Sequence, residues 1–271
     1  MKLSVILICH SSQHALRQAL NALFREKSKL LFEVIVVDNA AGPVDVIASE
    51  FPKVHVIANS NGQSISQAYN KAIKAASGDY VLLLSPDVIA TPESTAKLAD
   101  FMDQHPLAGG TSVRIVNYKG DYLSESKHSL GSAWISFLKF TGFTSYFPKS
   151  VKVNKNADWI EEFETSEVDV LNADCMLLRR SALNSAGLFD ERFTRYGHNI
   201  DLSYRLRKKG FKTYYYSKTY IIQLPGTELD KFSWDHIRHY YGAMFIFAAK
   251  YLFKQPVINI GEILPSSYEM E

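Results

Sequence analysis

Two apolar segments of the chain lead into a carboxylate. Residues 33–38 read Glu-Val-Ile-Val-Val-Asp and residues 79–87 read Asp-Tyr-Val-Leu-Leu-Leu-Ser-Pro-Asp, so Asp38 and Asp87 each follow an apolar run. Short apolar runs rich in β-branched residues are typical of parallel strands that are buried on both faces. Ligands of open α/β sheets bind beyond the carboxyl ends of such strands. We therefore expect Asp38 and Asp87 in one crevice, where two carboxylates favour a nucleotide and a metal ion.

The elements that must position these carboxylates alternate between strand and helix. Apolar runs predict strands at 3–8, 33–37 and 80–84, and helical spacing predicts helices around Leu16, Leu20 and Leu23 and at 64–76. Thr91-Pro92 is an N-cap followed by proline, which predicts a helix to about Gln104, and Gly109-Gly110 predicts a turn. This alternation predicts an α/β fold with a doubly wound, mostly parallel central sheet flanked by helices.

The second half of the sequence has weaker patterns. Strands are expected at 113–116, 168–179 and 211–222, a short helix at 181–186 that ends at Gly187, and a last helix at 233–252. That helix would bury a stripe made of Ile237, Tyr241, Met244, Ala248 and Tyr251. Residues 121–167 are rich in aromatics and poor in regular periods, so they are expected to shape a binding cleft or, alternatively, to form a loosely ordered cover.

Composition excludes several classes of protein. The 271 residues include 30 basic and 28 acidic side chains, and a formal charge of +2 is too small for a nucleic-acid-binding surface. Cys9 and Cys175 lie in apolar stretches, which favours buried thiols in a reducing, cytoplasmic setting. The N-terminus lacks the pattern of a secretory signal, and the apolar run at 243–252 is too short to span a bilayer.

The loop after the first strand narrows the choice among nucleotide-binding folds. Its sequence is Cys9-His10-Ser11-Ser12-Gln13, without the Gly-x-Gly-x-x-Gly of a dinucleotide dehydrogenase or the P-loop of a nucleotidase. It also lacks the glycine-rich, basic first loop expected of a nucleotidyltransferase. Another class of nucleotide-binding α/β protein is required.

Four segments in a fixed order carry a family resemblance. They are Ser4-Val-Ile-Leu-Ile, Val36-Val-Asp38-Asn39, the stretch from Asn70 to Asp87, and Leu188-Phe-Asp190-Glu-Arg-Phe193. Together they resemble family 2 glycosyltransferases of the GT-A fold over nearly the whole chain, and residues 137–150 and 167–170 are similar to the bacterial rhamnosyltransferase-like branch. The resemblance implies an inverting transferase of cell-surface polysaccharide synthesis. It would move a sugar from a nucleotide diphosphate donor to a glycan or lipid-linked acceptor.

The same resemblance implies one domain, 1–271, and a place for the protein in the cell. Residues 1–110 would bind the nucleotide sugar, residues 111–232 would form the acceptor side, and residues 233–271 would be a C-terminal helix and tail. The protein would be cytoplasmic, without a nucleic-acid partner. Basic and aromatic residues of the last helix are compatible with a peripheral contact with the inner face of the membrane, but ordinary packing of that stripe on the domain is the preferred explanation.

On the donor side, the family pattern implies two carboxylate roles. Asp38 would contact the nucleoside base, and Asp87 of Ser85-Pro86-Asp87 would hold Mg²⁺ or Mn²⁺ against the donor diphosphate. The alternatives are a turn-forming Asp38 and an ordinary loop carboxylate at Asp87. The other donor-binding candidates are His10, Asn39, Asn61, Asn70 and Ser85. His10 is equally explained as a loop residue, and Asn61 and Asn70 as caps of the helix they flank.

On the acceptor side, this chain departs from the family pattern. A Glu-Asp pair that supplies the catalytic base is replaced by His198-Asn199, and an asparagine amide does not accept a proton near neutral pH. Substitutes are His198, which titrates near neutral pH, Asp201, which is expected to start a helix, and Asp174, where relatives have a small residue. Asp174 is alternatively explained as a partner of Arg179 or Arg180.

A second departure concerns the metal. Relatives carry a histidine that can ligate the metal, and this chain has Gln223, a weak ligand through its carbonyl oxygen. Together with Asn199, it raises the alternative of a catalytically impaired subunit that binds a nucleotide sugar or a glycan.

Overall fold

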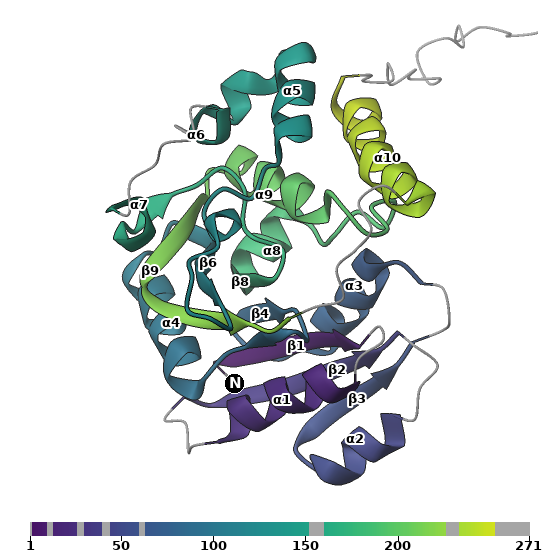
Figure 1. Ribbon diagram of the computed structural model, residues 1–271, viewed down its shortest axis with the longest axis vertical. Helices are drawn as coiled ribbons and strands as arrows, with labels where there is room; N and C mark the ends of the chain where they lie inside the picture. The colour runs from purple at the N-terminus through teal and green to yellow at the C-terminus, as the bar shows by residue number, and fades with distance from the viewer. Residues whose placement is uncertain are drawn as a thin grey trace, which may run out of the picture.

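One mixed β-sheet runs through the molecule and carries helices on both faces (Figure 1). The computed structural model describes residues 2–9, 13–25, 30–39, 44–59, 63–151, 160–225 and 233–252. Within these residues nine strands are joined, with eight in the order β3-β2-β1-β4-β8-β6-β9-β5 and β7 paired with β9. His10 and Asn61, both donor-binding candidates, lie outside the described residues.

The first half of the sheet is parallel, as the sequence predicts. It consists of β1 (Leu3–Cys9), β2 (Phe32–Asp38), β3 (Val54–Ala58) and β4 (Tyr80–Leu84). In register, Cys9 is opposite Asp38 and Leu7 is opposite Leu84. The carboxyl ends of β1, β2 and β4 therefore meet at one edge of the sheet, the edge where Asp38 lies.

Helices cover both faces of this half. Residues from α1 (Gln13–Phe24) and α4 (Pro92–Gln104) contribute to the core on one face, and residues from α3 (Ile65–Ala75) contribute to the core on the other. A shorter helix, α2 (Val44–Glu50), connects β2 to β3. Ser64 and Thr91 each form a capping box at the start of α3 and α4, which satisfies backbone N–H groups that a helix leaves unpaired. The predicted doubly wound arrangement is confirmed.

The second half of the sheet is mixed. The strand β8 (Cys175–Arg179) is antiparallel to both of its neighbours, β4 and β6 (Ala108–Asn117). A long strand, β9 (Lys212–Gln223), is parallel to β6 and also pairs with two short antiparallel strands, β5 (Val88–Ile89) and β7 (Ser166–Glu167). This pairing brings the end of β9 beside the segment that follows β4.

Two predictions of local structure were wrong. Gly109-Gly110 lies inside β6 rather than in a turn. A Cβ at Gly109 would meet the Cβ of Phe211 at 2.8 Å, which explains why this strand position is a glycine. These glycines allow close packing across the strand. The strand expected at 168–179 begins only at Cys175, and residues 168–174 run as an irregular segment in which the side chain of Asn172 accepts a hydrogen bond from the Asp174 N–H at 2.7 Å.

The aromatic stretch 121–167 supplies five of the twelve buried residues of a third core. Its described residues form η1 (Ser124–Ser126), α5 (Ser132–Phe140), η2 (Phe143–Tyr146), α6 (Pro148–Val151) and α7 (Ile160–Phe163). Trp134 and Phe147 from this stretch pack with Phe193 and with Phe247 of α10 (Trp234–Tyr251). Part of the stretch is therefore packed into a core with α10, and Figure 1 shows α5 at the top beside α10.

Two more helices complete the second half. The short helix α8 (Arg180–Ala186) ends at Gly187, whose φ of 83° lies in the left-handed region that glycine adopts without strain. It leads through residues 187–197 to α9 (His198–Lys208), the helix that begins with the altered pair.

The last helix is rotated relative to the prediction. Its buried residues are Ala243, Met244, Phe247 and Ala248, whereas Tyr241 is 55% exposed. Trp234 and Phe245 are 79% and 73% exposed, so a second aromatic stripe faces away from the core. None of the described helices is long and apolar enough to cross a membrane.

Candidate functional site

Asp38 and Asn39 lie where β1, β2 and β3 end. Asp38 is the last residue of β2 and is half-buried. The N–H of Asn39 donates to the carbonyl of Cys9 at 3.0 Å, and its side-chain amide donates to the carbonyl of Gln63 at 3.2 Å. Its side-chain oxygen accepts a bond from Asn59 at 2.8 Å. These bonds hold the segment that follows β2 at the edge where the parallel strands end.

Asp87 lies in a turn that is fixed on both sides. The hydroxyl of Ser85 donates to the carboxylate of Asp87. The carbonyl of Asp87 accepts the N–H of Leu224 at 2.8 Å, and the next residue, Val88, pairs with Gln223. The chain thus brings Asp87 and Gln223 together, although they are far apart in the sequence.

Asp174 lies beside the same turn. Its carbonyl accepts the N–H of Ser85 at 2.8 Å, because β8 runs antiparallel to β4 and Leu84 pairs with Cys175. Burial and the negative charges of Asp87 and Glu125 raise the pKa of the Asp174 carboxyl to about 6. The structure therefore places the Asp174 carboxylate within electrostatic reach of Asp87.

The alternative partners of Asp174 are engaged elsewhere. Arg179 donates to the carbonyls of Met102 at 2.6 Å and of Ala108 at 2.8 Å. Arg180 donates to the carbonyl of Gly78. Both arginines lie at the other end of β8, so the expected ion pair with Asp174 does not form.

Tyr69 is a residue of this site that sequence analysis missed. It lies on α3 and is 4% exposed, and the pKa of its hydroxyl is raised by burial and by the nearby charges of Asp174 and Asp87. Helical spacing predicts a buried face that includes Tyr69, but it gives no sign that this face approaches the end of β4. Only the pairing of β8 with β4 places Asp174 near this tyrosine.

His198 and Asn199, at the start of α9, are both buried. His198 is 4% exposed, and its ring centroid lies 5.9 Å from that of Tyr69 and 5.7 Å from that of Phe189. Neither ring nitrogen has a hydrogen-bond partner among the described residues, and burial lowers the His198 pKa to about 4. Asn199 is 7% exposed and donates its amide to the carbonyl of Leu171 at 2.8 Å.

Asp201 belongs to a charged cluster that holds helices together. Its carboxylate accepts from Arg205 at 2.8 Å, from Lys250 at 2.7 Å and from the hydroxyl of Tyr251 at 2.6 Å. Lys250 also pairs with Asp190 at 2.8 Å. Asp201 is 1% exposed, so this cluster ties α9 to α10 in the protein interior.

Asn70 is placed differently from the prediction. It lies inside α3 rather than at its end, so it does not cap the helix. Its side chain donates to the carbonyl of Phe189 at 2.9 Å and accepts the N–H of the same residue at 2.9 Å. Asn70 therefore fixes the segment 188–193 against α3.

The donor atoms around Asp87 suit a divalent cation. Asp87 and Asp174 are carboxylates, and Gln223 offers a carbonyl oxygen, and oxygen ligands are those that Mg²⁺ and Mn²⁺ prefer. No group of three or more His, Cys, Asp or Glu residues in the described part of the chain is arranged to hold an ion by itself. Mg²⁺ is commonly bound by one or two carboxylates together with substrate phosphates, so these residues fit an ion shared with a diphosphate.

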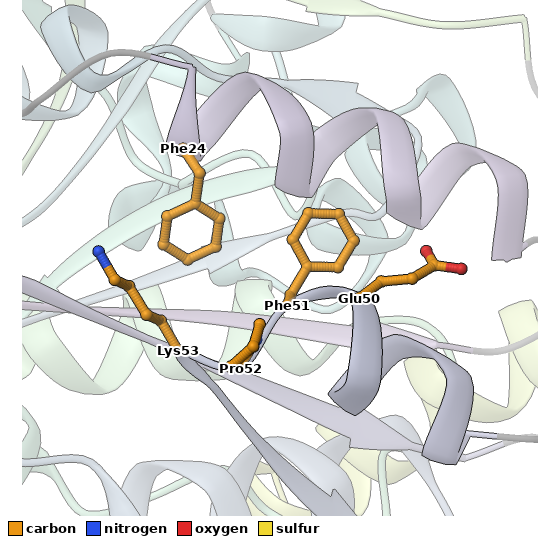
Figure 2. Close-up of a pocket in the computed structure, with 5 residues that line it drawn as sticks. All are labelled: Phe24, Glu50, Phe51, Pro52 and Lys53. Atoms are coloured by element: carbon orange, nitrogen blue, oxygen red, sulfur yellow. The ribbon is translucent and has the colours of Figure 1, made fainter.

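A separate pocket of about 300 Å³ lies at the opposite edge of the sheet. Figure 2 shows Phe24 and Phe51 facing each other, with Glu50, Pro52 and Lys53 around them. Phe24 ends α1, and residues 50–53 precede β3, so this pocket adjoins the amino ends of the strands. It is therefore distinct from the edge that holds Asp38 and Asp87.

A comparison with protein families decides the class of this protein. Residues 4–184 match the model of glycosyl transferase family 2. The chain belongs to this family. Over 231 residues it is 23% identical to an N-acetylglucosaminyl-diphospho-decaprenol L-rhamnosyltransferase of Mycobacterium tuberculosis, a match that covers 80% of this chain and 74% of that protein.

Solved structures show the same fold in this family 2 chain. The S. aureus protein TarS (residues 1–349), in complex with UDP-GlcNAc, superposes with a TM-score of 0.63 at 16% identity, covering 92% of this chain and 66% of TarS. GalNAc-T7, solved with UDP, GalNAc and Mn²⁺, gives a TM-score of 0.61 at 14% identity, covering 84% of this chain and 44% of that protein. The chain thus spans less than two thirds of each of these structures, and the predicted GT-A fold is confirmed.

Proposed function

We propose that this chain is an inverting glycosyltransferase that moves a sugar from a nucleotide diphosphate donor to a lipid-linked glycan acceptor. The observation that carries the proposal is the meeting of Asp38 and the 85–87 turn at the carboxyl edge of one parallel sheet. Asp38 would bind the nucleoside, and Asp87 would lie at the diphosphate. Membership of family 2 and the enzymatic relatives favour this function over a catalytically impaired binding subunit.

A divalent cation, Mg²⁺ or Mn²⁺, belongs to the proposal. Asp87 would hold it, and when bound it would neutralise charge that develops on the leaving diphosphate. The Ser85 hydroxyl orients the Asp87 carboxylate, and the Leu224 N–H fixes the backbone of the same residue. These bonds hold Asp87 in one geometry before a donor binds.

The general base that accepts the proton of the acceptor hydroxyl would lie outside residues 198–201. Asn199 has no basic atom and uses its amide for the Leu171 carbonyl. His198 is buried among aromatic rings with a pKa lowered to about 4, which makes it a poor base at neutral pH. Asp201 is neutralised by Arg205 and Lys250. We infer that the carboxylate base of the family pattern is replaced here by a group of the substrates or by a carboxylate beyond α9.

The acceptor side favours a lipid-linked substrate at a cytoplasmic membrane surface. The relative from M. tuberculosis is named for an acceptor linked to diphospho-decaprenol. On α10, Trp234, Tyr241 and Phe245 form an exposed aromatic stripe, with Arg238 exposed on the same helix. Aromatic side chains with flanking basic residues bind at the surface of anionic bilayers. We propose that this stripe rests on the membrane that holds the acceptor.

The experiment is a transfer assay. Purified protein is incubated with UDP-, GDP- and dTDP-sugars, Mn²⁺ or Mg²⁺, and a polyprenyl-diphospho-N-acetylglucosamine in anionic vesicles. The expected result is a glycosylated lipid that needs both the cation and one donor, and the variant Asp87→Asn serves as the inactive control. Folded protein that binds a nucleotide diphosphate but gives neither transfer nor donor hydrolysis with any donor would instead support the binding subunit.

The membrane contact has its own measurement. Sedimentation with anionic vesicles is compared between the wild type and a variant in which Trp234, Tyr241 and Phe245 are changed to serine. All three side chains are more than half exposed, so the changes leave the core intact. Equal sedimentation of both proteins would reject the contact.

A further inference from the structure

We propose that Asp174 is a second carboxylate ligand, beside Asp87, of the donor-bound cation. The inference rests on the proposed function, because the cation is the one that accompanies the nucleotide diphosphate.

Three segments meet at this point of the molecule. The 85–87 turn follows β4, residues 172–174 precede β8, and residues 223–224 end β9. Backbone bonds join them: the Ser85 N–H donates to the Asp174 carbonyl at 2.8 Å and the Leu224 N–H to the Asp87 carbonyl at 2.8 Å. Main-chain hydrogen bonds therefore hold the backbone of Asp174 beside the 85–87 turn, whatever its own side chain contacts.

The backbone of Asp174 is fixed on its other side as well. Its N–H donates to the side-chain oxygen of Asn172 at 2.7 Å, while the Asn172 amide donates to the carbonyl of Glu125 at 3.0 Å. The backbone N–H of Asn172 in turn donates to the hydroxyl of Ser112 at 2.6 Å. The backbone of Asp174 is thus fixed by contacts that do not involve its side chain.

The charges at this point are uncompensated. No ion pair in the described part of the chain involves Asp87 or Asp174, although other low-exposure carboxylates such as Asp201 and Asp169 are each paired with a basic residue. Glu125 adds a third negative charge within electrostatic reach of Asp174. Carboxylates held together without a cationic side chain repel each other, and a divalent cation removes that repulsion.

The identity of residue 223 leaves a place for a further protein ligand. Glutamine offers a neutral carbonyl oxygen, and it is a weaker ligand than histidine or a carboxylate for these ions. With Asp87 alone, the protein would provide one strong ligand. With Asp174, it provides two carboxylates, the upper end of the one or two that commonly hold Mg²⁺ together with substrate phosphates.

The test measures cation binding rather than turnover. Free Mn²⁺ is followed by electron paramagnetic resonance while the protein is added, first alone and then with UDP, GDP or dTDP. Wild-type protein is expected to bind Mn²⁺ more tightly in the presence of the nucleoside diphosphate that it recognises. Asp174→Asn should weaken this binding by at least about 10- to 100-fold, since the loss of a residue that only supports a ligand already costs that much.

Two control variants make the result specific. Asp87→Asn should lose Mn²⁺ binding in the same assay, and Asp100→Asn, which changes an exposed carboxylate on α4, should leave it unchanged. Thermal unfolding without metal should show that Asp174→Asn is at least as stable as the wild type, because the change removes repulsion. A stabilising structural role of Asp174 would instead lower the melting temperature.

The outcomes separate the two levels of the proposal. If Asp174→Asn binds Mn²⁺ and nucleotide as the wild type does while Asp87→Asn does not, Asp174 is not a ligand and the donor site stands. If the wild type binds no Mn²⁺ with any of the three nucleotides, the donor site and the ligand role of Asp174 both fail. An Asp174→Asn variant that retains Mn²⁺ binding but loses turnover would make Asp174 a base and overturn the ligand assignment.

Discussion

The carboxyl edge of the parallel strands and the start of α9 differ in whether their polar side chains are paired with other protein groups. At the strand edge, Asp87 and Asp174 lie close together without an ion pair in the described part of the chain. At the start of α9, Asn199 is bonded to the backbone and Asp201 is paired with Arg205 and Lys250. Polar groups that are left for a ligand mark a binding site, and polar groups that satisfy each other mark a structural element.

This contrast explains how a chain can depart from its family pattern and keep the fold. The segment that follows α8 is held by bonds from Asn70 and by the charged cluster around Asp201, none of which needs a catalytic base at position 199. The donor side has less freedom, because Asp38 and Asp87 are placed by strand register.

The largest effect is expected at the strand edge. Asp87→Asn should lower kcat by about 10³- to 10⁴-fold, because a cation at a leaving diphosphate contributes several kcal/mol to the transition state. Asp38→Asn should act mainly on KM for the donor, because it removes a contact that the substrate and the transition state share. Steady-state kinetics of both variants measure this difference. A kcat of Asp87→Asn within tenfold of the wild type would contradict the assignment of the strand edge as the catalytic region.

A large effect on stability is expected at the charged cluster. Lys250→Met removes the cation that Asp190 and Asp201 share, while Arg192 and Arg205 stay paired with them, so the cost should be below the about 3–5 kcal/mol of a buried charge left without any partner. Urea denaturation should show this loss in the free energy of unfolding, while Lys250→Arg should retain most of the stability. If Lys250→Met unfolds at the wild-type urea concentration, the cluster does not hold α10 to α9.

The buried histidine gives a pH-dependent effect of intermediate size. Because the His198 pKa falls from 6.5 to about 4 on folding, the unfolded chain binds the proton first as the pH falls. The neutral, buried His198 therefore contributes to the free energy of unfolding in full above pH 6.5. This contribution is lost as the pH falls from 6.5 to 4, and the loss amounts to about 3 kcal/mol.

The variant His198→Phe isolates this effect. It should lack that part of the acid sensitivity, and urea denaturation at pH 7 and pH 4.5 measures the difference. The same change at His14, an exposed residue of α1, is the control and should behave as the wild type. Equal acid sensitivity of His198→Phe and the wild type would show that the imidazole is already charged in the folded protein.

The smallest effect concerns the restored family residue. Asn199→Asp replaces the amide that donates to the Leu171 carbonyl with a carboxylate that cannot donate, which should cost about 1–3 kcal/mol of stability. We expect no rise in turnover, because the side chain is placed by that bond. Thermal unfolding measures the stability and the transfer assay measures the turnover. The control is the same change at Asn184, an exposed residue of α8, written Asn184→Asp. A rise in turnover of tenfold or more would show that position 199 still faces the acceptor.

Much of the first half was predictable because its signals are local. The N-cap at Thr91, the buried face of Leu16, Leu20 and Leu23, and the apolar runs of β1, β2 and β4 depend on residues close in sequence. The predicted strand at 168–179 was too long, because its apolar residues Val168 and Val170 are buried outside the sheet. Apolar patterns report burial, and they do not report which element a buried residue belongs to.

The sequence alone determined the alternation of strands and helices and the position of Asp38 and Asp87 at strand ends. Only the tertiary structure decided that Asp174 lies at the 85–87 turn, because that depends on the antiparallel pairing of β8 with β4. It also decided that the residues at the start of α9 are engaged in packing. Strand pairing and helix packing join residues that are distant in the sequence, and no local pattern encodes those contacts.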